Sequence, residues 1–532
     1  MREIAAVTLR YLFEIGSTFA LLDVREHGEY NAAHIPGASS LPRRLLEHRV
    51  RQLVPGLQTQ VVVCDDDGRR ARLAARTLER LGYARVAVLD GGLNGWASDG
   101  YPTEWGMNVP SKAFGERVEV RDHVPSIEAR ELAACIKRGD DLVILDTRTP
   151  EEFGRFCIPG GRSVPNGELP YRIGEIVRER PDAKIVVNCA GRTRSIIGTR
   201  ALQRMGYRNV VGLKNGTSGW VLAGQKLEAG AGAQPDRVAL PEPTAASRAE
   251  AEAYARRVMD EDGVVTITAD ALAQLLTAND DGTSHYFIDV RTRAEFEAGH
   301  IPGFWWFPGG QIVQRSDDVI GVRNGTVVLA CDGIARAGAT ASWLKQLGFP
   351  HVSVVEGGTV AWAASGRDLT AGSADDVPAG LAEARARVRP MEPAELAMLL
   401  ETPGPPLTLH VGTSREFAAG HVPGSQWVSR GWLEARVEEL APDWTEPIVV
   451  TDLDGTDCWP AAATLLDLGY HDVTALAGGT RAWAAAGRPI ERGLTGVMEP
   501  PVDVVPAGPE RSYADMIQYL RWEEALAHDP PR

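Results

Sequence analysis

Residues 185–206, IVVNCAGRTRSIIGTRALQRMG, contain the clearest structural pattern in the chain. The first residues of this stretch are apolar and β-branched, as is typical of a strand in a parallel sheet that is buried on both faces. After the polar loop, Ile197, Ala201 and Met205 recur at every fourth position, and Gly206 is a residue type that ends helices. Strand, loop and helix in this order belong to a βαβ unit, so the stretch predicts an α/β domain.

The same pattern occurs four times along the chain. In each copy one residue opens the polar loop: Asp65, Cys189, Cys331 and Asp452. Counting 17 residues forward reaches a glycine each time, and counting 31 forward reaches Trp96, Trp220, Trp362 and Trp483. Counting 42 or 43 residues back reaches Asp23, Asp146, Asp289 and His410. Spacing this regular indicates one structural unit written four times.

These repeats divide the 532 residues into four expected domains and a tail. The four domains are predicted at residues 1–106, 122–228, 262–370 and 388–494. A helical lead-in, AEAEAYARRVMDE, precedes the third of them. The tail, 495–532, contains an amphipathic helix, and we expect it to dock on its own protein through Tyr513, Met516, Ile517 and Leu520.

Composition excludes several classes of function. The formal charge is −15, which argues against a nucleic-acid or anionic-membrane surface, since both need clustered positive charge. No run of about 18 apolar residues occurs, so we expect no transmembrane helix. The N-terminal residues do not have the pattern of a signal peptide. Six cysteines without a CxxC pair favour a reducing compartment, with the cytoplasm as the expected location, and predict no metal site or other cofactor.

The repeated motifs resemble those of the rhodanese superfamily. The resemblance is carried by Asp23-Val24-Arg25, by the segment Tyr30 to Ala38 with its His-Ile-Pro-Gly-Ala, by the cysteine loop and by the Gly-Gly…Trp ending. It covers nearly the whole chain and implies four tandem α/β domains, each a small parallel sheet flanked by helices. In that superfamily a cysteine after the central strand takes sulfane sulfur from thiosulfate as a persulfide. It passes this sulfur to cyanide or a thiol.

The departures from the pattern are as informative as the matches. Only the second and third repeats have a cysteine at the loop start, in CAGRTR and CDGIAR, whereas the first and fourth have Asp65 and Asp452. We therefore expect repeats 1 and 4 to be inactive. The fourth repeat has also lost Asp-x-Arg and reads His410-Val411-Gly412.

The Cys189 loop carries the predicted chemistry. A nucleophilic cysteine must be a thiolate, and backbone N–H groups at a helix start stabilise negative charge there. Gly191 allows the loop to close tightly, and Arg192 and Arg194 are expected to bind an anionic donor such as thiosulfate. Thr193 and Ser195 can donate further hydrogen bonds, with Ser195 also placed to cap the helix. The donor-binding segment is thus predicted as Ala190, Gly191, Arg192, Thr193, Arg194 and Ser195.

Other residues receive supporting roles. Asp146 and Arg148 are expected to form a structural pair that supports the loop. Cys331, with Arg336 at the spacing of Arg194, is a candidate second catalytic site. Its neighbour Asp332 should disfavour the thiolate and repel an anionic donor, so we expect Cys331 to be the weaker nucleophile.

The predicted function is therefore thiosulfate sulfurtransferase, with a small anionic sulfur donor and cyanide, a thiol or a protein thiol as acceptor. Mercaptopyruvate or another persulfide donor is an alternative, and so is a non-catalytic sulfur-carrier or docking scaffold. Phosphatases that share the fold have five residues between Cys and Arg in this loop, whereas Cys189 and Arg194 enclose four. The shorter loop favours sulfur transfer.

Overall fold

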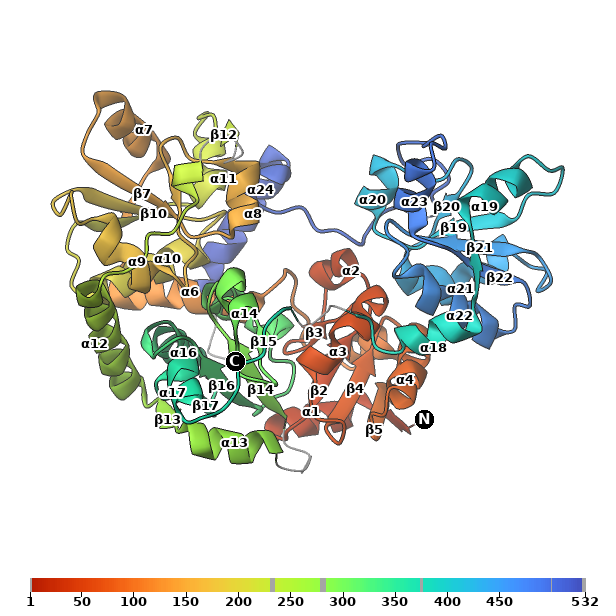
Figure 1. Cartoon of the computed structure of the whole chain (residues 1–532), viewed down its shortest axis with the longest axis horizontal. Helices are drawn as coiled ribbons and strands as arrows, with labels where there is room; N and C mark the ends of the chain where they lie inside the picture. Colours follow the sequence, from red (N-terminus) through yellow and green to blue (C-terminus); the bar gives the residue numbers. More distant parts are fainter. Residues whose placement is uncertain (1, 230–234, 278–283, 374–376, 499, 529–532) are drawn as a thin grey trace.

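Each repeat folds around one five-stranded parallel sheet, in a computed structural model that describes residues 2–229, 235–277, 284–373, 377–498 and 500–528 (Figure 1). All four sheets have the same order: the first strand, the last, the central strand, the second and the third. In repeat 1 the strands are β1 (Arg2–Ile4), β5 (Arg85–Leu89), β4 (Gln60–Cys64), β2 (Ala20–Asp23) and β3 (Ser39–Ser40). In repeat 2 they are β6 (Ser126–Ile127), β11 (Val210–Leu213), β10 (Lys184–Asn188), β7 (Leu142–Asp146) and β9 (Arg162–Ser163). In repeat 3 they are β13 (Val265–Ile267), β17 (Val352–Val355), β16 (Thr326–Ala330), β14 (His285–Asp289) and β15 (Trp305–Trp306). In repeat 4 they are β18 (Arg389–Met391), β22 (Val473–Leu476), β21 (Ile448–Thr451), β19 (Leu407–His410) and β20 (Gln426–Trp427).

Five helices flank each sheet, so the α/β prediction is confirmed. Repeat 1 has α1 (Ala6–Glu14), α2 (His27–Ala32), α3 (Leu46–Leu53), α4 (Arg69–Arg80) and α5 (Gly92–Ser98). Repeat 2 has α7 (Ala129–Arg138), α8 (Pro150–Arg155), α9 (Leu169–Ile176), α10 (Thr193–Met205) and α11 (Gly216–Leu222). Repeat 3 has α13 (Ala269–Thr277), α14 (Arg293–Ala298), α15 (Gly309–Gln314), α16 (Ala335–Leu347) and α17 (Gly358–Ala364). Repeat 4 has α19 (Pro393–Leu400), α20 (Ser414–Ala419), α21 (Arg430–Leu440), α22 (Cys458–Leu468) and α23 (Gly479–Ala485).

The repeated tryptophan closes the end of each unit. All four of these side chains are at most 5% exposed. Each indole N–H donates to the backbone carbonyl six residues later, at Pro102, Lys226, Asp368 and Pro489, over 2.8–3.0 Å. The spacing seen in the sequence thus comes from a buried ring that fastens the chain as it leaves the repeat.

Helices between the repeats cover the loop helices. The linker helices α6 (Val109–Asp122), α12 (Ala245–Asp262) and α18 (Leu381–Arg387) pack on α10, α16 and α22 respectively. The lead-in expected before the third repeat is thus confirmed as α12. In repeat 2 a small antiparallel pair, β8 (Phe156–Cys157) and β12 (Glu228–Ala229), joins the end of the unit to α8.

Repeats 1 and 3 share one apolar core. Buried side chains of both repeats form a single cluster that includes Leu53, Val61, Tyr286 and Val322. The Tyr286 hydroxyl, which is fully buried, donates to the carbonyl of Leu53 at 2.7 Å and accepts from the N–H of Val322 at 2.9 Å. One phenol therefore satisfies two backbone groups at the joint between the two repeats.

The C-terminal tail runs from repeat 4 past repeat 1 to repeat 2 (Figure 1, blue). Val497 bridges to Trp427, and the carbonyl of Val502 accepts from the N–H of Gly28 at 2.6 Å. The tail then forms a short 3-10 turn, Gly508–Glu510, the helix α24 (Tyr513–Ala525) and a second turn, Leu526–His528, which packs on α6. Over the described ranges, no helix combines the length and apolarity that a membrane crossing needs.

The tail helix docks as expected, but by a different face. Met516 and Leu520 are buried, whereas Tyr513 is 58% and Ile517 is 41% exposed, so the predicted stripe is wrong for these two residues. The buried face instead continues to Glu523, which is 3% exposed. The spacing of apolar residues in the sequence could not predict that Glu523 would be buried.

The joint between repeats 1 and 3 can be tested with Tyr286→Phe. Loss of the hydroxyl leaves two buried backbone groups unsatisfied, so the free energy of unfolding in urea should fall by about 1–3 kcal/mol. Tyr11→Phe is the matched control because Tyr11 is 58% exposed, and its unfolding curve should equal that of the wild type. Equal stability of both variants would contradict the assigned role of Tyr286.

Candidate active site

Cys189 opens the loop between β10 and α10 and is 2% exposed. Its thiol lies 3.5 Å from the Ser195 hydroxyl, which itself donates to the carbonyl of Arg192 at 2.8 Å. The helix begins at Thr193, and no side chain caps it. The capping role predicted for Ser195 is therefore wrong: the serine lies inside the first turn and is oriented to accept from the cysteine thiol.

The loops of repeats 1 and 4 show which groups face the position of the sulfur. The Asp65 carboxylate accepts from the backbone N–H groups of Gly68, Arg70 and Ala71 at 2.5–3.2 Å. The Asp452 carboxylate accepts from four such groups, those of Gly455, Thr456, Asp457 and Cys458, at 2.5–3.1 Å. In these repeats a carboxylate thus occupies an anion cradle made by the loop and the helix start.

A second turn holds the loop start in place. The N–H of Thr217, the second residue of α11, donates to the carbonyl of Cys189 at 2.8 Å. Gly216 must come this close, because a Cβ there would lie 2.2 Å from the same carbonyl oxygen. The other three repeats make the same contact, from Leu93, Thr359 and Thr480 to Asp65, Cys331 and Asp452 at 2.7–2.9 Å. The glycine of the final turn therefore sets the geometry of the cysteine loop.

Asp146 and Arg148 lie together beneath the loop as a fully buried ion pair. The Arg148 guanidinium donates to both Asp146 oxygens at 2.8–3.1 Å and to the carbonyl of Phe156 at 2.6 Å. Asn188, the residue before the cysteine, donates to the same carboxylate at 3.0 Å. The pair thus joins the end of β7 to the end of β10. Among the residues that the structure describes, neither side chain forms a hydrogen bond with Cys189.

The two loop arginines are both bound to carboxylates. Arg194 forms a double ion pair with Glu152 of α8 at 2.6 and 2.9 Å, and although burial alone would raise the pKa of Glu152, this arginine lowers it to about 2. Arg192 binds Glu116 of α6 through two nitrogens at 2.7 Å each, and also Glu119 and Glu524. A donor anion would therefore meet arginines whose charge is already balanced.

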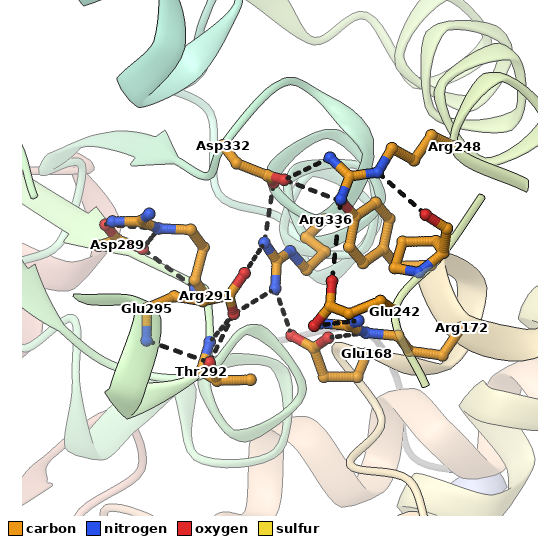
Figure 2. Close-up of polar contacts among 12 residues, drawn as sticks. Glu168, Arg172, Glu242, Arg248, Asp289, Arg291, Thr292, Glu295, Asp332 and Arg336 are labelled. Atoms are coloured by element: carbon orange, nitrogen blue, oxygen red, sulfur yellow. Dashed lines mark hydrogen bonds and ion pairs between the residues drawn. The ribbon is translucent and has the colours of Figure 1, made fainter. Parts of the chain in front are cut away.

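In the Cys331 loop, Asp332 and Arg336 belong to a larger network of ion pairs (Figure 2). Arg336 donates to Glu295, Glu168 and Asp332 at 2.7–2.9 Å, and its guanidinium lies 4.5 Å from the ring centre of Tyr171. Tyr171 also donates to Asp332 at 2.8 Å. Burial first, and the Asp332 charge second, raise the pKa of Cys331 to about 11 against the effect of Arg336 and two backbone N–H groups.

The cysteine loops are covered by different parts of the chain. Repeat 2 covers the Cys331 loop, through Glu168 and Tyr171, so uncovering it requires the two repeats to separate. The Cys189 loop is instead covered by the tail. A Cβ built on Gly508 would lie 3.5 Å from the Cβ of Ala190, and a Cβ built on Gly191 would lie 3.2 Å from Glu523 Oε2. The tail and the linker helix α6, which binds Arg192 through Glu116, thus both lie against the Cys189 loop.

Several of these functional neighbours were missed by reasoning from the sequence. Glu29, Glu152 and Glu295 occupy one position of the repeat and bind Arg70, Arg194 and Arg336. Aligning the repeats from Asp-x-Arg onward could have found them. Glu116, Glu523 and Glu524 lie outside the repeats and have no such signal. Within the described ranges no group of three or more His, Cys, Asp or Glu side chains is arranged to hold a metal ion.

Comparison with known proteins places this architecture. The rhodanese-like domain model matches residues 8–99, 128–223, 268–365 and 392–486. The chain belongs to the rhodanese family. A crystal structure of a thiosulfate sulfurtransferase from Pseudomonas aeruginosa is similar over 99% of this chain and 97% of its own, with 37% identity and a TM-score of 0.89.

Two curated relatives match parts of this chain. A sulfurtransferase from Allochromatium vinosum is 28% identical over 106 residues, which cover 20% of this chain and 96% of the relative. A thiosulfate sulfurtransferase from Azotobacter vinelandii is 24% identical over 240 residues, which cover 38% of this chain and 87% of the relative. The family resemblance expected from the motifs is confirmed.

The role of the final turn is tested by Gly216→Ala with Gly224→Ala as its control. Both glycines have positive φ, +52° and +77°, so each alanine should cost about 1–2 kcal/mol of backbone strain. Gly224 faces open space, whereas at Gly216 the new methyl must also displace the Cys189 carbonyl, at a further cost of about 1–3 kcal/mol. Thermal unfolding and the alkylation rate of Cys189 should both change more in Gly216→Ala; equal effects would contradict the contact.

The buried state of Cys331 predicts its pH dependence. Because its pKa is raised to about 11, the thiol is neutral at lower pH, and alkylation by iodoacetamide should rise about tenfold per pH unit up to at least pH 10. Peptide mass analysis after timed alkylation measures this rate. The same peptide in the urea-unfolded chain is the control, with a midpoint near pH 8.5. A plateau below about pH 9 in the folded protein would show that Asp332 and burial do not suppress the thiolate.

Proposed function

We propose that this member of the rhodanese family is a sulfurtransferase that moves sulfane sulfur from thiosulfate to cyanide or a thiol through a persulfide on Cys189. The observation that carries the proposal is the anion cradle. Carboxylates occupy it in repeats 1 and 4, and Cys189 stands at the same position of a loop with the same spacing. A thiolate, a persulfide and a bound donor all carry the negative charge that such a cradle stabilises.

The reaction has two balanced halves. In the first, the Cys189 thiolate attacks the outer sulfur of thiosulfate, a new S–S bond forms, and sulfite leaves with the electron pair of the broken S–S bond. In the second, the acceptor attacks the outer sulfur of the persulfide, and the thiolate of Cys189 leaves. Neither half needs a general base at the cysteine, because both leaving groups are stable anions.

The loop residues have distinct parts in this proposal. The backbone N–H groups from Ala190 to Ser195 hold the negative charge on sulfur, and before ionisation the Cys189 thiol donates a hydrogen bond to the Ser195 hydroxyl at 3.5 Å. Arg192 and Arg194 bind the sulfonate end of the donor, for which each must share its guanidinium with Glu116 or Glu152. Asp146 and Arg148 act as positioning residues beneath the loop.

Cys331 is the weaker candidate for the same chemistry. Its raised pKa and the carboxylate of Asp332 both disfavour attack on an anionic donor. We therefore assign the turnover to Cys189. All six cysteines are free and buried, which fits a reducing compartment such as the cytoplasm.

The assignment is tested by comparing Cys189→Ser with Cys331→Ser in a thiosulfate:cyanide assay. Loss of the nucleophile should lower kcat for Cys189→Ser by at least about a thousandfold, whereas Cys331→Ser should retain most of the wild-type rate. Circular dichroism confirms that both variants are folded. Wild-type turnover in Cys189→Ser would refute the assignment, and an inactive wild-type protein would favour the scaffold alternative.

A further inference from the structure

The tail helix α24 brings an acidic side chain to the mouth of the Cys189 loop. Glu523 is 3% exposed, and its Oε2 lies 3.2 Å from the Cβ position of Gly191, two residues after the cysteine. The other oxygen is 3.4 Å from the Tyr519 hydroxyl, which donates to it. Oε2 accepts no hydrogen bond from any residue that the structure describes. A buried carboxylate oxygen without a donor thus faces the place where a substrate must enter.

Apolar and aromatic contacts hold this helix over the loop. Met516, Leu520 and Leu526 are at most 4% exposed. Trp522 lies against Trp105, with ring centres 4.4 Å apart, and covers Gly106. α24 lies beside repeat 2 in Figure 1, although the chain reaches it from repeat 4. The packing of these apolar side chains therefore fixes the position of Glu523.

Charged groups from three elements surround Glu523. They are Lys112, Glu116 and Glu119 of α6, Arg192 of the loop, and Arg511, Tyr519 and Glu524 of the tail. Burial raises the pKa of Glu523, while Lys112, Arg192 and Arg511 lower it. The carboxyl is consequently neutral at low pH and becomes negative as the pH rises, and in its ionised form it repels an anion that approaches Gly191.

The third repeat has a matching arrangement. Glu252 of α12 has its Oε1 3.2 Å from the Cβ position of Gly333, which is two residues after Cys331. Glu252 and Glu523 both come from helices outside the four repeats. Both cysteine loops therefore have a carboxylate at the same position, supplied by unrelated parts of the chain.

We propose that Glu523 is a specificity-determining residue of the Cys189 site: carried on the lid formed by residues 508–528, its carboxylate competes with anionic sulfur donors and favours neutral ones. A substrate reaches Cys189 by passing the inner face of this lid, where Glu523 lies beside Gly191. The charge of Glu523 therefore acts on each substrate as it enters. This inference rests on the proposed function only where it concerns thiosulfate.

The test compares two alkylating reagents of nearly equal size, iodoacetate and iodoacetamide, at Cys189. The first is an anion and the second is neutral. The ratio of their rate constants cancels both the thiolate fraction and the frequency of lid opening, because both reagents need the same thiolate and the same opening. The ratio therefore reports the local charge, and peptide mass analysis assigns each rate to Cys189.

In the wild type the ratio of the iodoacetate rate constant to the iodoacetamide rate constant should fall as the pH rises and Glu523 ionises. In Glu523→Gln the ratio should fall less steeply with pH, and it should exceed the wild-type ratio by roughly tenfold at high pH, where Glu523 is ionised in the wild type. Asp515→Asn is the matched control, since it removes one negative charge from the exposed face of the same helix, and its ratio should follow the wild type. The KM for thiosulfate should fall by a similar factor in Glu523→Gln, with kcat little changed.

Three outcomes separate the claims. A ratio in Glu523→Gln that follows the wild type at every pH contradicts the charge selection. A parallel rise of both rates at constant ratio also contradicts it, because Glu523 would then only fasten the lid. If the ratio changes as expected while thiosulfate adds no sulfur to Cys189, the proposed function fails and the charge selection stands.

Discussion

The structure depends on one requirement: the backbone N–H groups at the start of each loop helix must find an acceptor within their own loop. These groups are buried where the central strand ends, and no preceding turn supplies carbonyls for them. Asp65 and Asp452 meet the requirement with a carboxylate. In repeats 2 and 3 a cysteine stands at this position, and for Cys331 the N–H groups of Gly333 and Ala337 favour the thiolate. The same geometry is a structural cap in two repeats and a candidate reaction centre in the others.

Accessibility and charge distinguish the two cysteines. Cys331 is enclosed by the contact between repeats 2 and 3, where Arg336 is shared among three carboxylates (Figure 2). An anionic donor would have to open that contact and displace a carboxylate from the arginine. Cys189 is covered by the tail helix α24 and flanked by the linker helix α6, and no residue of repeat 3 that the structure describes supplies a carboxylate to Arg192 or Arg194. The four related loops therefore differ in the residue at the loop start and in the charged groups around it.

The sequence predicts what is local to the repeat. The spacing around Cys189 predicted the strand, the loop and the helix, because these elements recur in every repeat. The Asp146-x-Arg148 motif predicted a buried pair, which recurs in repeats 1 and 3. Contacts between distant segments were not predictable. Arg192 is bound by Glu116 and Glu524, which lie 76 and 332 residues away. The capping role of Ser195 was predicted wrongly because the first residue of a helix is uncertain by one or two positions in a sequence pattern. Glu523 was missed because acidic side chains are mostly exposed, so a pattern of apolar residues does not point to a buried glutamate.

The central claim is that sulfur passes through Cys189, and the most direct measurement is to find it there. The full chain is incubated with thiosulfate, freed of excess reagent and digested without reductant, and the mass of each cysteine peptide is measured. We expect one extra sulfur atom on the peptide that contains Cys189, removed by cyanide, and little on the Cys331 peptide. Extra sulfur on Cys331 with none on Cys189 would contradict the claim.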